Sequence, residues 1–194
     1  MGILVGRDSQ IRIARLVELE AAGWDRVLLK SGIDAIFRAT AARWPDDPAA
    51  AQAFQQLWLD QYFDHERELL FVAHRADAAR EAPSVVGYLA GCTVNPSTSP
   101  RFAKLDYFRA FAAQCAAYPA HLHVNVDAEF RGAGLGAALV EALSDRLTAD
   151  GISGVHVVTG RTQRNVRFYQ RLGFRAQAAA PRGTGDVVFL GRKL

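Results

Sequence analysis

The chain has 194 residues, of which 50% are hydrophobic and 22% are charged. This composition is typical of a soluble globular protein and excludes a disordered or fibrous chain, and the length allows one large domain or two small ones. The formal net charge of +3 suits an anionic small ligand as well as nucleic acid. Two isolated cysteines, Cys92 and Cys115, give no metal-ligand spacing and indicate a reducing compartment.

No apolar stretch approaches the roughly 20 residues that span a bilayer, and residues 1–7 lack the shape of a signal peptide. We therefore expect a cytoplasmic protein with no membrane partner. The basic residues are scattered and the excess of positive charge is small, so we expect no nucleic-acid partner either. We expect no metal, and the sequence leaves the oligomeric state open.

The first elements in the chain are predicted to be a strand and two helices. Residues 11–14 predict a short strand. Helical spacing then predicts one face that is formed by Leu16, Leu19, Trp24, Val27 and Leu28. The aspartates and prolines of 44–48 mark the start of a second helix, which is expected to run to about residue 63.

The middle of the chain predicts two strands and a short helix. The apolar runs 69–73 and 85–90 are typical of an antiparallel pair joined by a long polar loop. Residues 95–100 form a loop by composition. The segment 102–118 contains five aromatic residues and predicts a short helix. Its rings are interpreted as core packing, and a lid that faces a substrate is the alternative.

The last third carries the most informative pattern. Polar and apolar residues alternate over 121–127, which predicts a strand with one buried face. A glycine-rich segment, 131–136, leads from this strand into a helix with Leu139, Leu143 and Leu147 on one side. A strand over 154–159, a helix over 162–172 and two final strands follow. This order predicts an α/β arrangement with at least one βαβ crossover.

A strand that feeds a glycine-rich turn into a helix makes an anion site, because exposed amides and the positive end of the helix dipole meet there. Arg131 adds a charged donor, and a plain tight turn is the alternative. The P-loop pattern fails, since no Gly-Lys-Ser/Thr follows. The dinucleotide pattern is formally met by Gly132, Gly134 and Ala137, but the next strand ends without the acidic residue that binds ribose.

Two motifs resemble those of a known family. Arg131-x-x-Gly134-x-Gly136 is similar to motif A of the GNAT acetyltransferases, and residues 165–174 resemble their motif B. Residues 118–194 also look like the acetyltransferase-like domain of O-GlcNAcase and its free-standing bacterial relatives.

The resemblance implies one GNAT domain over residues 1–194. Its fold class would be α/β (α+β): a mixed, mostly antiparallel central sheet with splayed parallel strands and helices on both faces. Residues 1–117 would be the acceptor-side half, and residues 118–194 would be the half that binds acetyl-CoA.

The same resemblance implies acetyl-CoA (coenzyme A) as the cofactor. Backbone groups of two strand residues would bind the pantetheine arm, and the amides of the turn would hold the pyrophosphate. The expected cofactor-binding residues are Val124, Val126, Arg131, Gly132, Ala133, Gly134, Leu135, Gly136 and Asn165. Asn165 also fits the cap of a helix.

The catalytic residues implied are Tyr169 and His123. Tyr169 matches the family tyrosine that donates to the coenzyme A sulfur, and a core aromatic is the alternative. A histidine with a pKa near 6.5 can accept a proton, so His123 is the expected base, with His121 as a second choice and a purely structural histidine as the alternative. Asp127 is expected to cap the following turn.

The function implied is acetyl-CoA-dependent N-acetyl transfer, directly to a primary amine of a small molecule or peptide. The alternative is a catalytically inactive GNAT-like module that binds coenzyme A or a protein partner. A complete motif A argues against that alternative.

Overall fold

The computed structural model describes residues 3–5, 10–79, 84–161, 165–183 and 185–194. It divides into two compact units. The first unit comprises residues 1–91 and 123–143, and the second comprises residues 92–122 and 144–194.

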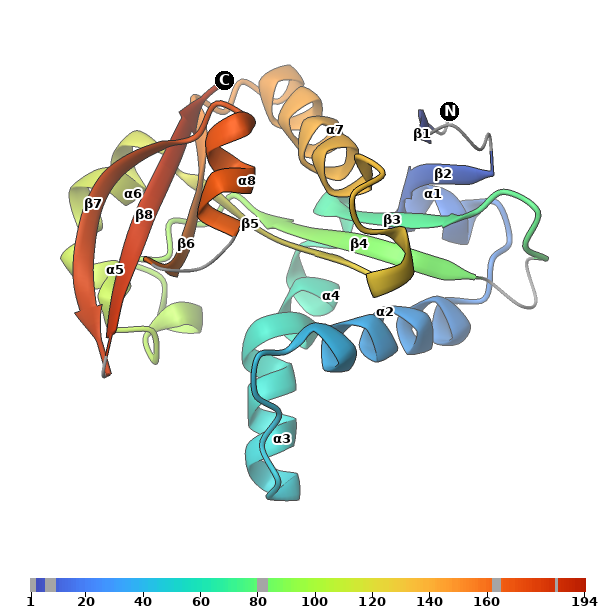
Figure 1. Ribbon diagram of the computed structural model, residues 1–194, viewed down its shortest axis with the longest axis horizontal. Coiled ribbons are helices and arrows are strands. Elements are labelled where there is room, and N and C mark those ends of the chain that lie inside the picture. Colours follow the sequence, from blue (N-terminus) through green and yellow to red (C-terminus); the bar gives the residue numbers. More distant parts are fainter. Residues whose placement is uncertain (1–2, 6–9, 80–83, 162–164, 184) are drawn as a thin grey trace. The chain divides into compact units, whose positions relative to one another are not determined.

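The strands of the first unit follow one another in an antiparallel ladder (Figure 1). They are β1 (Ile3–Val5), β2 (Ile11–Arg15), β3 (Leu70–Arg75) and β4 (Val85–Cys92). The predicted strand near residue 11 and the predicted antiparallel pair are confirmed, whereas β1 was not predicted. A register shift between Ala73 and His74 marks a bulge in the β3–β4 ladder, a feature that re-aims the side chains beside it.

The first predicted helix is in fact two helices, α1 (Leu16–Ala21) and α2 (Arg26–Thr40). Gly23 takes a φ of 84°, which ends α1, because this conformation strongly favours glycine. The Asp25 side chain then accepts from the backbone N–H groups of Val27 and Leu28 and starts α2. The single apolar face was therefore a wrong prediction: Leu16 is fully buried, but Val27 is 75% exposed.

The second predicted helix is confirmed in its extent, and its start is confirmed by Asp47, whose side chain accepts from the Ala50 N–H at 2.7 Å. It consists of α3 (Pro48–Gln55), a π-helical turn η1 (Gln56–Asp60) and α4 (Gln61–His65), followed by the 3₁₀ turn η2 (Arg67–Leu69). The π-helical turn was not predicted.

Glycines allow helices to approach β4 closely. A Cβ atom on Gly32 of α2 would lie 2.8 Å from Val85, and one on Gly91 would lie 2.8 Å from Leu143 of α7 (Leu135–Ala149). Figure 1 shows α2 and the start of α7 on opposite faces of the β3–β4 ladder. The strands of the first unit are thus covered on both faces.

The second unit contains the remaining strands and three short helical segments before them. The helical segments are η3 (Pro100–Phe102), α5 (Tyr107–Ala110) and α6 (Ala112–Ala117). The later elements are β5 (Ala120–Val126), whose last four residues belong to the first unit, and β6 (Gly154–Gly160), α8 (Asn165–Arg171), β7 (Arg175–Arg182) and β8 (Gly185–Lys193).

The pairing of these strands confirms the predicted crossover. β5 and β6 are parallel, with Ala120 opposite Val155 and His121 opposite His156, at the start of both strands, as a splayed pair requires. β8 pairs antiparallel with both β6 and β7. The mixed, mostly antiparallel α/β class is therefore confirmed. Residues 162–164 of the helix predicted after β6 lie outside the described residues.

The aromatic segment before β5 is core, as interpreted from the sequence. Phe102, Leu105, Phe108 and Phe111 are all at most 7% exposed, although the segment forms several short pieces and not the single helix predicted. Over the described ranges, no helix has both the length and the apolar character needed to cross a membrane.

Candidate functional site

The glycine-rich turn forms an open loop at the start of α7. Gly132 and Gly134 both take a φ of +84°, and a Cβ atom on either would meet nothing within 4 Å. The first amides of α7 have no acceptor inside the helix, and its first turn contains no acidic residue. The positive end of a 15-residue helix therefore faces an exposed, sterically open loop, which suits an anionic group.

Arg131 joins this loop to the end of β5. Its side chain is exposed, and its Nε donates to the Val126 carbonyl at 3.1 Å. The 3₁₀ turn η4 (Ala128–Phe130) lies between them, and the Asp127 side chain accepts from the Glu129 N–H at 2.9 Å. The predicted cap at Asp127 is thereby confirmed, and the Arg131 side chain is held at the start of the glycine-rich turn.

The backbone N–H and C=O groups of successive residues in β5 point alternately toward β4 and away from it. The Asp127 N–H donates to the Val86 carbonyl at 3.0 Å, and the Asn125 carbonyl lies 3.2 Å from the position of a Cβ on Gly87, so both face β4. Neighbouring residues in a strand direct their backbone groups to opposite edges. Val124 and Val126 therefore direct theirs away from β4.

His123 lies among aromatic residues of the first unit. Its Nε2 is 2.9 Å from the Tyr62 hydroxyl, and its ring meets the Trp58 ring edge-on, with centroids 5.3 Å apart. Burial lowers the pKa of His123 to about 4, so the imidazole is neutral at pH 7. On the same face of β5, Asn125 donates to the Tyr88 hydroxyl at 2.8 Å.

Tyr169 and Asn165 lie on α8 in the second unit. Tyr169 is 4% exposed and packs against Phe168 and Phe174, with ring centroids 5.0 and 5.5 Å away. Burial raises the pKa of the Tyr169 phenol, which keeps its proton at neutral pH. Asn165 is the first residue of α8, and its Oδ1 accepts from the Thr159 hydroxyl at 3.0 Å.

His121 is enclosed by rings in the second unit. It is 3% exposed, and its ring centroid lies 4.9 Å from that of Phe102 and 5.5 Å from that of His156. This packing favours a structural role for His121. His123, in contrast, keeps part of its surface accessible.

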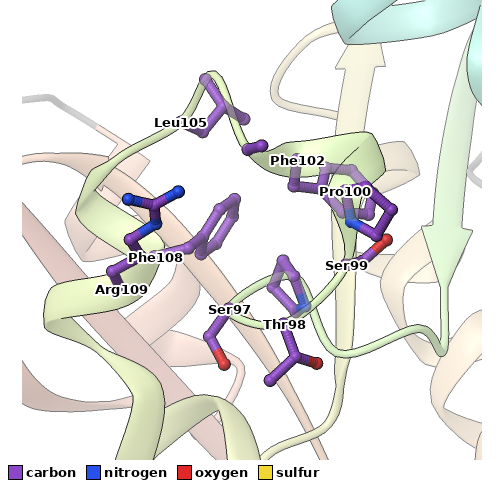
Figure 2. A pocket seen from close by; sticks show the side chains of 10 residues that line it. Ser97, Thr98, Ser99, Pro100, Phe102, Leu105, Phe108 and Arg109 are labelled. Carbon is purple, nitrogen blue, oxygen red and sulfur yellow. The ribbon is translucent and has the colours of Figure 1, made fainter.

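A cavity of about 280 Å³ lies in the second unit, lined by residues of the segment 96–109 (Figure 2). Figure 2 shows the Phe108 ring between the Arg109 guanidinium and the loop that carries Ser97 and Thr98. None of the site residues expected from the sequence lines it. Across the described part of the chain, no three His, Cys, Asp or Glu side chains are grouped so as to hold a metal ion.

Comparison with known proteins agrees with this fold. The chain is 25% identical to SsHAT, with a TM-score of 0.68 over 95% of this chain and 98% of that one. It is 19% identical to an agmatine N-acetyltransferase, with a TM-score of 0.61 over 95% and 100% of the two chains. It is 19% identical to yncA from Salmonella typhimurium, whose structure contains its cofactor acetyl-CoA, with a TM-score of 0.53 over 94% and 92%.

The match to a family model places the chain in the acetyl-transferring class. Residues 33–174 match the model of the acetyltransferase (GNAT) family, and the chain belongs to this family. Membership supports acetyl transfer as its general activity.

Sequence reasoning missed the aromatic partners of the predicted site. Tyr62 contacts His123 from 61 positions away in the sequence, and Tyr88 contacts Asn125 from 37 positions away. The alternation of β5 indicated which strand residues share a face, but nothing local to β5 indicates which rings cover that face.

Proposed function

We propose that the chain is an acetyl-CoA-dependent N-acetyltransferase that transfers acetyl directly to a primary amine of a small molecule or peptide. Residues 1–194 would form one GNAT domain, with the acceptor half in 1–117 and the cofactor half in 118–194. The open turn at Gly132 and Gly134, beside Arg131 and at the start of α7, is the observation that carries this proposal.

The residues present fit a polyanionic cofactor. The exposed amides from Arg131 to Gly136 would hold the pyrophosphate, and both positive-φ glycines leave room for it. Val124 and Val126 direct backbone groups away from β4 and would bind the pantetheine arm, and the Val126 N–H would polarise the acetyl carbonyl. Asn165 would contribute from α8. The acetyl-CoA bound to yncA supports this choice of cofactor.

Acetyl-CoA, when bound, would supply an acetyl group as a thioester. Transfer of this acetyl group to an amine gives an amide and free coenzyme A thiol. The amine must lose one proton and the thiol must gain one. His123, neutral because burial lowers its pKa, would accept the amine proton and release it to water, since so weak a base does not retain it at pH 7. Tyr169, whose phenol burial keeps protonated, would supply the proton that the departing thiolate gains, and the phenol would regain a proton from water.

A catalytically inactive binding module is the second candidate. The deep burial of Tyr169 among Phe168 and Phe174 is the observation that favours it, because a phenol packed in the core can be purely structural. The likeness of residues 118–194 to the O-GlcNAcase-linked domain and the cytoplasmic location both stay predictions.

Two measurements test the proposal in sequence. Isothermal titration calorimetry with acetyl-CoA should show binding. A panel of primary amines, assayed for release of free thiol, should then show turnover that depends on the amine. Absence of binding would overturn both the N-acetyltransferase and an inactive module that binds coenzyme A. Binding without turnover of any amine would favour the inactive module.

A further inference from the structure

The turn that carries Trp58 departs from α-helical geometry. η1 (Gln56–Asp60) is a π-helical turn between α3 and α4, and such turns occur frequently at functional sites. Trp58 lies in the middle of it and is half-buried. Its ring meets that of His123 with centroids 5.3 Å apart. The turn therefore places a large apolar ring, with part of its surface exposed, against the proposed base.

Two further aromatic residues, Phe54 and Trp44, follow Trp58 in a chain of ring contacts. The Phe54 centroid lies 6.3 Å from that of Trp58, and the Trp44 centroid lies 5.8 Å from that of Phe54. All three side chains are half-buried, so each keeps some apolar surface in water. A ligand that covers this surface removes it from water, which favours binding of an apolar body.

The charges beside these rings disfavour a second cation. The Lys30 ammonium lies 2.8 Å from Asp60 and 2.9 Å from Asp34, so the carboxylate of the π-helical turn already has a cationic partner. The Arg38 guanidinium lies 5.0 Å from the Trp44 ring centroid, so a cation already occupies one side of that ring. A polycationic acceptor would meet the Arg38 guanidinium at the Trp44 ring as a like charge.

We propose that Trp58, with Phe54 and Trp44, forms the acceptor subsite and selects an arylalkylamine over a polycationic amine. The inference rests on the proposed function, because the subsite is located by the contact between Trp58 and His123. In this arrangement the rings hold the apolar body of the acceptor, while its amino group lies at His123.

The test compares acceptors and variants. The acceptors are 2-phenylethylamine, agmatine and a lysine-containing peptide, each assayed for thiol release and each titrated calorimetrically into the protein with coenzyme A present. The variants are Trp58→Ala, Trp58→Phe and a matched control, Trp24→Ala. Trp24 is also half-buried and packs on His74 with centroids 4.5 Å apart.

We expect 2-phenylethylamine to have a kcat/KM at least tenfold above those of agmatine and the peptide. Trp58→Ala should raise its KM at least tenfold and leave the Kd of acetyl-CoA unchanged, while Trp58→Phe should restore most of the loss and Trp24→Ala should have no effect on KM. Preference for agmatine or the peptide, or an unchanged KM in Trp58→Ala, would overturn the inference. If Trp58→Ala fails to fold, an unchanged KM in a folded Trp58→Leu protein overturns it equally.

The calorimetric arm separates this inference from the proposed function. If no amine is turned over, the proposal of acetyl transfer to amines fails. Binding of 2-phenylethylamine that is weakened at least tenfold by Trp58→Ala still supports the subsite, and binding that is absent, or that Trp58→Ala does not change, overturns it.

Discussion

The substitution Gly134→Glu separates the proposed role of the glycine-rich turn in cofactor binding from its contribution to the stability of the fold. A side chain at a φ of +84° costs about 1–2 kcal/mol of backbone strain, but no atom lies within 4 Å of its Cβ, so no clash is added. A carboxylate beside the first turn of α7 returns about 0.3–1 kcal/mol through the helix dipole. The net loss of stability is thus about 1 kcal/mol, which lowers Tm by about 2–4 °C in a chain of this length.

The effect on the cofactor should be much larger. At a concentration of 100 times its Kd, acetyl-CoA stabilises the folded protein by about 2.7 kcal/mol, which corresponds to a rise in Tm of about 5–11 °C. In Gly134→Glu the new carboxylate occupies the space proposed for the pyrophosphate and repels it, so this rise should disappear. Thermal unfolding with and without acetyl-CoA measures both quantities in the same experiment.

Gly151→Glu is the matched control. Gly151 also has a positive φ, +73°, and an open Cβ direction, but it follows the C-terminal end of the same helix. The backbone strain is similar, and the helix dipole destabilises a carboxylate at this end of the helix. This variant should be the less stable of the two and should keep the full rise in Tm with acetyl-CoA. A folded Gly134→Glu protein that also kept this rise would refute the location of the site.

Three further results are expected. Tyr169→Phe should lower kcat by about 10²-fold or more, the contribution typical of proton transfer, with little change in KM for acetyl-CoA; an unchanged kcat would remove the phenol from the mechanism. Because the pKa of His123 is lowered to about 4 in the folded protein, the unfolded chain binds a proton at this histidine more tightly. The free energy of unfolding should therefore fall by up to about 3 kcal/mol as the pH drops from 6.5 to 4. Urea titrations of His123→Gln should not show this fall. Gly191→Ala should destabilise the protein by about 1–3 kcal/mol, because its Cβ would lie 2.8 Å from the Tyr118 ring. Gly185→Ala on the same strand should be near neutral, because no atom lies within 4 Å of its Cβ. Equal Tm values for the two variants would contradict the packing.

The second half of the fold could be predicted because its signals are local. The alternation of 121–127, the glycines of the turn and the leucines of α7 each specify their own conformation. The first half was harder, since Leu16 and Val27 share helical spacing yet lie in different helices. There the backbone of one glycine, Gly23 with a φ of 84°, outweighs the apolar pattern.

The candidate site divides in the same way. The turn from Arg131 to Gly136 could be identified from the sequence, because its chemistry lies in consecutive backbone amides. The surroundings of His123 could not, because Tyr62 and Trp58 come from a distant helix, and the pKa of the imidazole depends on that packing. A histidine on a strand carries no local signal of how deeply it will be buried.

The π-helical turn also sets the angular phase of α4 relative to α3. Phe54 and Tyr62 are eight positions apart, and in an unbroken α-helix they would differ in direction by about 80°, since each residue advances about 100°. A π-helical turn absorbs roughly one extra residue, which reduces the difference to about 20° and places both rings on nearly the same side. Conversion of η1 into regular α-helix without removal of a residue would therefore rotate α4 by about 100° and turn Tyr62 away from His123. Deletion of one residue would instead remove the π-helical turn and keep both rings on nearly the same side.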